Sequence, residues 1–216
     1  GIFRGSPDPG LSRLTHATNG LANATDALGR PKEAEDLLRG LVALQRDRYG
    51  PSHPSVAGAI GSLAEFLSRH NRLAEADSLR RQEIAILEQA TGPDSHVLAY
   101  SIERLAVVLT QRGLYREADS VFSVAIPMRE RVSGSQHALL ARALADYADL
   151  LTRQGHFPEA EVTLTRALGI LEQQYPDAHP DTQQVIRGFV TLYESWKRPD
   201  DAARYKARIQ KVGPGV

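Results

Sequence analysis

The sequence contains no cysteine at all. This absence excludes a disulfide framework, a thiolate zinc site, an iron–sulfur cluster and a cysteine nucleophile. Long apolar runs are also missing, because no stretch of the 216 residues approaches the roughly 18 apolar residues that a membrane span needs. We therefore expect no membrane insertion.

A surplus of charge of one sign is lacking too. Lys and Arg together number 26, Asp and Glu together number 26, and the formal net charge is zero. Domains that bind nucleic acid normally carry a basic surplus, so we expect no nucleic-acid partner. The Gly-x-x-x-x-Gly-Lys-Ser/Thr, His-Glu-x-x-His and Gly-x-Ser-x-Gly motifs are absent. We predict no enzymatic activity, no catalytic residue, no cofactor and no metal site.

A repeat of 42 residues is present instead, without insertion or deletion. Its clearest mark is an acidic residue followed by alanine, and other positions recur with the same period. A fixed period of this length is typical of solenoid architectures built from stacked helical units. The acidic-Ala pairs are Glu33-Ala34, Glu75-Ala76, Glu117-Ala118, Glu159-Ala160 and Asp201-Ala202.

Each repeat has the pattern of two helices. In the third copy, Ile102, Leu105, Ala106 and Leu109 form one apolar stripe at helical spacing, and a second stripe follows Gly113. Gly113 is suited to the left-handed conformation in which many helices end. Gly and Pro clusters separate the repeats, with Pro54 and Pro180 suited to the first turn of a helix. We predict helices at 11–28, 31–48, 54–70, 73–90, 95–112, 115–132, 137–154, 157–174, 180–196 and 199–211.

Two features depart from this regular pattern. Pro127 falls inside the helix predicted at 115–132, where it removes one backbone hydrogen bond, so we expect a kink or a local break near residues 123–126. The Gly- and Pro-rich residues 1–10 and the tail 212–216 are predicted to be flexible and to lie outside the array. The absence of an initiating Met also suggests a processed chain or a piece of a longer one.

The motif Gly113-x-Tyr115-x-x-Ala118, preceded by Leu105-Ala106 and followed by Phe122-x-x-Ala125, resembles the tetratricopeptide repeat (TPR). A period of 42 rather than 34 residues resembles the kinesin-light-chain type. The resemblance implies an all-α fold, a right-handed α-solenoid of five helix-turn-helix repeats with about ten antiparallel helices. It predicts one domain at 11–211, with repeats at about 11–52, 53–94, 95–136, 137–178 and 179–211. HEAT or armadillo repeats are the alternative, but they do not explain the Gly-x-aromatic-x-x-Ala signature.

Arginine outnumbers lysine by 22 to 4, which favours a GC-rich bacterial source. The chain also departs from the family at one position. Members of the family often carry an Asn, just before the Leu-Ala pair, that contacts the backbone of a bound peptide. Here that position holds other residues, so the ligand of the family cannot be carried over. They are Gly20, Ser62, Arg104, Asp146 and Gly188.

Three histidines, His53, His137 and His179, share one repeat position. Equivalent positions of adjacent repeats lie roughly 8–10 Å apart, a helix-packing distance. Only His137 and His179 belong to adjacent repeats, and two imidazoles make a poor zinc site without further ligands. We predict that each histidine lies at a helix start and bonds to the connector.

The resemblance implies a binding module whose first helices line a concave groove. It predicts a protein or peptide partner, an extended segment or a helix, of unknown identity. The alternatives are a structural spacer, self-association through the end repeats, or a regulatory segment of a larger signalling protein. The predicted groove residues are Glu65, Arg69, Tyr100, Glu103, Gln111, Arg142, Asp149 and Arg153.

Two of these residues suggest a ligand. Arg69 and Arg153 occupy the same position two repeats apart, roughly 16–20 Å, which an extended peptide spans in about six residues. An acidic peptide could therefore engage both guanidinium groups. The competing interpretation pairs each arginine with the carboxylate four residues earlier, Glu65 or Asp149, in the favourable order for an intrahelical ion pair.

Overall fold

The computed structural model describes residues 9–210, and these residues form ten helices and no strand. All ten predicted helices are present, and each end lies within two residues of its predicted position. Their bounds are α1 Pro9–Ala27, α2 Pro31–Tyr49, α3 Pro54–Arg69, α4 Leu73–Ala90, α5 His96–Gln111, α6 Tyr115–Ser133, α7 Ala138–Gln154, α8 Phe157–Glu172, α9 Pro180–Ser195 and α10 Pro199–Gln210. The predicted flexible segments, 1–10 for the most part and 212–216, fall outside the described residues.

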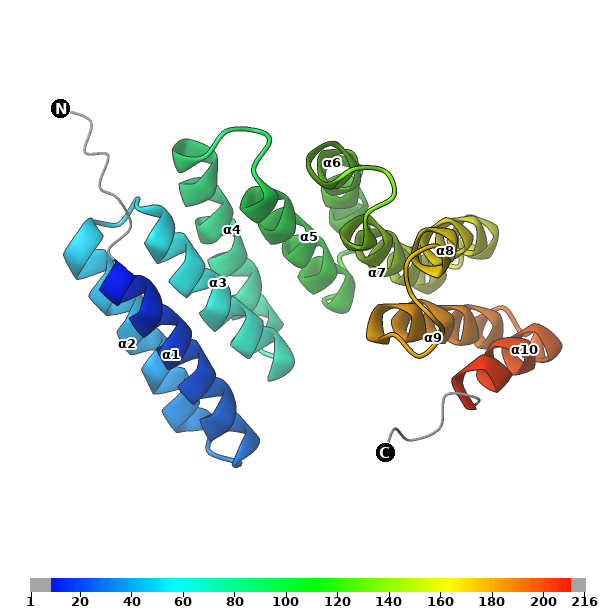
Figure 1. Cartoon of the computed structure of the whole chain (residues 1–216), viewed down its shortest axis with the longest axis horizontal. Helices are drawn as coiled ribbons and strands as arrows, with labels where there is room; N and C mark the ends of the chain where they lie inside the picture. Colours follow the sequence, from blue (N-terminus) through cyan, green and yellow to red (C-terminus); the bar gives the residue numbers. More distant parts are fainter. Residues whose placement is uncertain (1–8, 211–216) are drawn as a thin grey trace. The chain divides into compact units, whose positions relative to one another are not determined.

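The helices pack as consecutive antiparallel pairs, the helix-turn-helix repeats of an α-solenoid (Figure 1). The chain divides into two compact units, Gly1–Pro93 and Asp94–Val216. In the first unit, α1 pairs with α2, α3 pairs with α4, and α2 contacts α3. In the second unit, the pairs are α5 with α6, α7 with α8 and α9 with α10. There α6 contacts α7, α8 contacts α9, and α7 touches both α5 and α9.

The alanine of the acidic-Ala pair is buried in all five helix pairs. Ala34, Ala76, Ala118 and Ala160 have no exposed surface, and Ala202 is 2% exposed. A larger side chain would force the two helices of a pair apart, because the interior is close-packed. The small residue at this position therefore permits the close approach of the two helices in each repeat.

The turn between the two helices of each pair depends on one left-handed residue. Gly29, Gly113 and Gly155 have φ of 76°, 76° and 80°, as their position in the sequence predicts. Asn71 and Lys197 occupy the same position with φ of 58°. Lys197 is the only one of the five that is neither Gly nor Asn. Its repeat nevertheless makes the same turn, despite the backbone strain that a residue with a Cβ has at positive φ.

Pro127 does not break its helix, because α6 runs continuously from Tyr115 to Ser133. The proline and Ser123, the residue whose carbonyl loses its hydrogen bond, are both exposed. Water can therefore satisfy that carbonyl, so the lost hydrogen bond leaves no buried polar group unpaired. The predicted local break is thus not observed.

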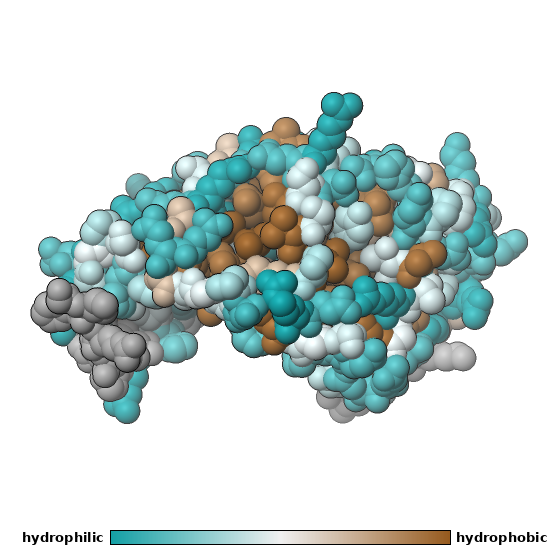
Figure 2. Space-filling view, turned by 90° about the horizontal axis from the view of Figure 1, so that it is seen from above, coloured by the Kyte–Doolittle hydropathy of each residue, from teal (hydrophilic) through white to brown (hydrophobic). Residues whose placement is uncertain are grey.

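Hydrophilic residues cover most of the molecular face in Figure 2, with hydrophobic residues visible as patches between them. The apolar residues of each helix pair lie mainly in the core. Within residues 9–210, none of the helices combines the length and the apolar composition that a membrane span requires.

The close helix approach can be tested by Ala118→Arg in α6. We expect a loss of several kcal/mol in the free energy of unfolding, because the long side chain overpacks the core and its charge is desolvated. Ala203→Arg is the matched control, since Ala203 is exposed on α10. Urea unfolding of the two variants and the wild type provides the measurement. Coincident unfolding midpoints for all three would show that Ala118 is not at a helix contact.

Candidate functional site

The candidate partner site lies in the second unit, on the first helices of its three pairs. Tyr100, Glu103 and Gln111 come from α5, and Arg142, Asp149 and Arg153 come from α7. Because α7 contacts both α5 and α9, the three helices form one continuous surface. We call this surface the α5–α7–α9 face.

Three predicted residues are accessible on this face. Tyr100 and Gln111 are exposed on α5, and the side chain of Arg142 on α7 is 50% exposed. The Arg142 Nε atom lies 3.7 Å from Asp181 Oδ1 of α9. This distance allows an electrostatic attraction but exceeds that of a hydrogen bond. The donors of Arg142 are therefore only loosely held by Asp181.

Glu103 lies beneath the surface rather than on it. Its two carboxylate oxygens accept hydrogen bonds from Arg129 of α6, at 2.5 Å from Nε and 2.9 Å from Nη2. Both side chains are buried, and burial raises the pKa of Glu103 although Arg129 opposes the shift. Glu103 thus joins α5 to α6. The prediction that it lies on the groove surface is wrong, because its carboxylate is buried against Arg129.

The sequence did contain a signal for this buried ion pair. Arg129 stands at the position that Leu87 and Leu171 occupy in other repeats, and both leucines are buried. A charged side chain at a core position needs a charged partner, because an unpaired buried charge is very costly. Glu103 is the residue on the facing helix that satisfies this need.

Two residues that were not among the predicted site residues complete the charge pattern of the face. Arg104 Nη1 of α5 lies 3.8 Å from Asp146 Oδ2 of α7. Both residues occupy the position at which the family often carries Asn. Opposite charges at one position of adjacent repeats were the available signal, since such positions lie within reach of long side chains.

Asp146 is the most perturbed carboxyl of the face. Burial raises the pKa of Asp146 to about 6, and the neighbouring carboxylates Glu103 and Asp149 add to this effect, whereas Arg104 and Arg142 oppose it. The group therefore changes charge in mildly acidic solution. Its environment disfavours the ionised form, as expected for a carboxylate removed from water.

Asp149 and Arg153 form the predicted intrahelical pair. Arg153 Nε donates to Asp149 Oδ2 at 2.8 Å, and this hydrogen bond is the main cause of the raised pKa of Arg153. Both side chains remain nearly half exposed. The competing interpretation of Arg153, a residue paired within its own helix, is thus confirmed.

Glu65 and Arg69, the remaining predicted residues, belong to α3 of the first unit, and each bonds to another helix. Glu65 Oε2 accepts from Arg80 Nη2 of α4 at 2.7 Å. Arg69 Nη2 donates to Asn23 Oδ1 of α1 at 3.0 Å. These bonds join α3 to α4 and to α1.

A small cleft opens on the α5–α7–α9 face between α7 and α9. Its volume is about 60 Å³, enough for a few waters or one small side chain. Ala145 and Thr152 line it from α7, and Gly188 and Thr191 line it from α9. A Cβ added at Gly188 would lie 3.0 Å from Leu164 Cδ2, so the glycine allows α9 to approach α8 closely.

The three histidines at one repeat position are helix N-caps. The Nδ1 atoms of His53, His137 and His179 accept from the backbone N–H two residues later, at 3.1, 3.1 and 3.3 Å. The predicted location at helix starts is confirmed, although the bond is made to the first turn of the helix. Among residues 9–210, no three His, Asp or Glu side chains group as a metal site would require.

The unusual carboxyl can be tested by Asp146→Asn. Because the folded state holds the pKa of Asp146 above its unfolded value, ionisation destabilises the fold at neutral pH, and this cost decreases as the pH falls from about 6 towards the unfolded pKa of about 4. The stability advantage of Asp146→Asn over the wild type should therefore shrink by about 2 kcal/mol between pH 7.5 and 4.5. Urea unfolding at both pH values measures it. A difference that stays constant with pH would show that Asp146 titrates normally.

Two family models described as tetratricopeptide repeat match the sequence, at residues 14–55 and 96–173. Together they cover more than half of the chain. No curated protein matches it.

Solved structures share the fold. The nearly identical TPR-like repeats of a Podosopora anserina protein named as a putative kinesin light chain align with a TM-score of 0.75, at 21% identity, over 94% of this chain and 95% of that one. A variant of that protein, with a glutamine replaced by methionine, aligns over the same shares and at the same identity, with a TM-score of 0.77. BtubC (BKLC) from P. vanneervenii aligns with a TM-score of 0.66 at 18% identity, over 97% and 95% of the two chains.

These structural matches extend over nearly the whole chain, and the family models match segments in both compact units. The ten helices, the buried alanine of each pair and the left-handed turn residue fit the same repeat. The chain belongs to the tetratricopeptide-repeat family, in a form similar to the repeats of kinesin light chains.

Proposed function

We propose that the α5–α7–α9 face binds an acidic peptide segment of a partner protein. TPR repeats are generally protein–protein interaction modules, and their families are typically not enzymes. The observation that carries the proposal is the half-exposed guanidinium of Arg142, whose carboxylate neighbour Asp181 is 3.7 Å away. A ligand carboxylate could approach this group closely.

The electrostatic basis is the long distance between Arg142 and its carboxylate neighbour Asp181. A bidentate arginine–carboxylate pair has hydrogen bonds of about 2.7–2.9 Å, whereas the present contact of Arg142 is about 1 Å longer. Arg153 is bound more tightly to Asp149, but a guanidinium has five N–H donors and this one is 47% exposed. Both arginines can therefore donate hydrogen bonds to an additional carboxylate without losing a buried bond.

Apolar and shape complementarity would come from the remainder of the face. Tyr100 offers an exposed ring, a residue type enriched where proteins bind each other. The cleft between Ala145 and Gly188 has room for one small side chain. Gln111 and Asp149 supply polar contacts at the rim. Glu103 is not part of the proposed set, because its carboxylate is buried against Arg129.

The two predicted residues of the first unit have a different role in the proposal. Arg69 is exposed on α3 and donates one hydrogen bond to Asn23, which leaves further donors on its guanidinium. It is proposed as a contact of the first unit for an acidic ligand, separate from the α5–α7–α9 face. Glu65 is proposed as its support, because it anchors the buried Arg80 and so fixes the face of α3 from which Arg69 projects.

The proposal is tested with a library of 12-residue peptides that vary in the number and spacing of Asp and Glu. Fluorescence anisotropy is measured against the wild type and the double variant Arg142→Ala, Arg153→Ala. We expect acidic peptides to bind best, the double variant to bind them at least about tenfold more weakly, and the affinity to fall with added salt.

Arg166→Ala is the matched control. Arg166 lies on α8 in the same unit, is similarly exposed and pairs with Glu130. It should leave peptide affinity unchanged. Preferred binding of peptides without acidic residues, or equal affinity of the double variant and the wild type, would rule out the α5–α7–α9 face as the acidic-peptide site.

A further inference from the structure

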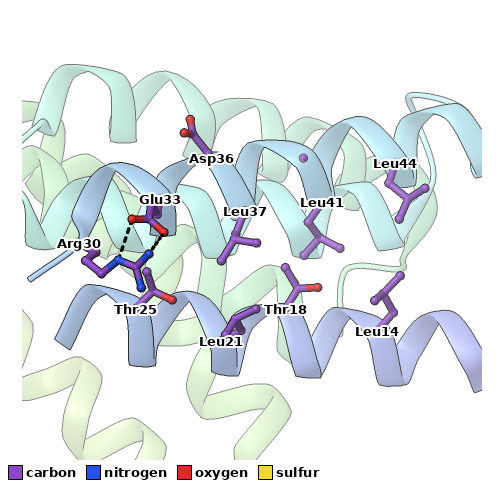
Figure 3. A pocket seen from close by; sticks show the side chains of 11 residues that line it. Leu14, Thr18, Leu21, Thr25, Arg30, Glu33, Asp36, Leu37, Leu41 and Leu44 are labelled. Carbon is purple, nitrogen blue, oxygen red and sulfur yellow. Dashed lines mark hydrogen bonds and ion pairs between the residues drawn. The ribbon is translucent and has the colours of Figure 1, made fainter. Parts of the chain in front are cut away.

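The outer face of the first helix pair carries an apolar groove. Leucines from α1 and α2 point toward one another across a space of about 670 Å³ (Figure 3). Leu21, in the middle of α1, is 55% exposed, and Leu14 and Leu44 are each exposed by more than a third. We call this the α1–α2 groove. Exposed leucines in this number, gathered in one groove, mark a surface suited to a partner.

The internal repeats show that the same positions are normally covered. Leu63 of α3 and Phe189 of α9 are equivalent to Leu21, yet they are only 3% and 1% exposed. Val56 and Leu140, equivalent to Leu14, have no exposed surface. In each case the second helix of the preceding pair contacts the helix that carries them: α2 contacts α3, α6 contacts α7 and α8 contacts α9. Among the described residues, no helix covers the α1–α2 groove, which is otherwise the same surface.

The contacts of the covering helices identify the apolar side chains that fit. Phe122 of α6 lies against Tyr147, the residue equivalent to Leu21, with ring centroids 5.3 Å apart. Leu164 of α8 reaches α9 beside Gly188. One turn later, Ile126 and Leu168 join the core that includes the following pair. Each covering helix therefore presents two bulky apolar residues four positions apart.

On each covering helix, an acidic residue lies three positions before the first of the two apolar residues. Arg72, at the start of α4, bonds to Glu75 of its own helix at 2.6 Å and to Glu35 of the preceding pair at 2.6 Å. Arg198, at the equivalent position of the last pair, bonds to Asp201 at 2.7 Å and lies 3.7 Å from Glu161 of the preceding pair. The arginine in this position therefore joins two acidic residues, one from each pair.

Arg30 is the equivalent arginine at the α1–α2 groove. It bonds to Glu33 of its own helix, at 2.7 Å from Nε and 2.5 Å from Nη2. Within the described part of the chain, no acidic residue of a preceding pair stands beside it. Its guanidinium is well exposed at the edge of the groove, with donors left for a second carboxylate.

We propose that the α1–α2 groove binds an amphipathic helix of a partner protein with the pattern acidic-x-x-apolar-x-x-x-apolar. The acidic residue pairs with Arg30, and the two apolar residues cover Leu21 and its leucine neighbours. The chain carries this pattern three times at its own covering helices: Glu35, Leu38 and Val42; Asp119, Phe122 and Ile126; Glu161, Leu164 and Leu168.

A second copy of the chain, stacked head to tail, would not supply this helix. Its last helix, α10, has Ala203 at the acidic position and Lys206 at the first apolar position. Ala203 offers no carboxylate, and Lys206 would bring a charge against the leucines. Helix α10 is therefore not complementary to the α1–α2 groove, and a partner helix that carries the pattern is the proposed occupant.

The probe is a fluorescein-labelled peptide with the sequence of α8, Phe157–Glu172. A hydrocarbon staple between the positions of Val162 and Arg166, which are exposed in α8, keeps the peptide helical without touching the pattern. Anisotropy is measured with the full chain. We expect saturable one-to-one binding that Leu21→Asp weakens at least about tenfold. Val162→Asp in the protein, a change at an exposed apolar residue of the second unit, should have no effect.

A charge exchange tests the acidic position. Arg30→Glu should weaken binding of the peptide at least about fivefold, and a peptide with Glu161→Arg should recover the affinity for this variant. Circular dichroism checks that the variants remain folded, which their exposed positions favour. No binding up to about 1 mM, or binding that Leu21→Asp leaves unchanged, would overturn the proposal. So would self-association, measured by light scattering, that Leu21→Asp abolishes, because the groove would then belong to a second copy.

Discussion

The structure depends first on the close contact between the two helices of each pair, which recurs at a constant spacing of 42 residues. The alanine there is buried in all five pairs, and no larger residue replaces it. Because this contact fixes the rotation of both helices, the remaining positions of the repeat point in corresponding directions in each copy. Burial and charge can therefore be compared between equivalent residues, and a difference between them indicates a different neighbour or a different partner.

The helices and turns were predictable because they depend on local and periodic signals. The acidic-Ala pair, the apolar stripes and the Gly or Asn at the turn are all read along the chain, and the helix ends agree within two residues. Lys197 and Pro127 are instructive exceptions. At Lys197 the repeat makes the same turn although the local residue disfavours it, and at Pro127 the helix continues because the freed carbonyl belongs to an exposed residue.

The ionic contacts were predicted less well, because each depends on which of several charged neighbours is nearest. Asp149 and Arg153 pair within one helix as expected, whereas Glu65 reaches across to Arg80. Glu103 was assigned to a surface by its place on the helix, but Arg129 occupies a core position and draws it inward. A charged residue at a position that is buried in the other repeats is therefore the sequence signal of such an ion pair.

Comparison of equivalent positions also shows how α10 differs from the covering helices and how the first pair resembles the later ones. Solenoid repeats bury their faces against neighbouring helices, so an apolar face that no described helix covers is suited to a partner. The last helix, α10, has an exposed alanine and lysine where the covering helices carry acidic and apolar residues. The first pair instead keeps the leucines and the arginine of an internal repeat. Its surface thus retains the chemistry of a helix contact, and this distinguishes the α1–α2 groove from an ordinary solvated surface.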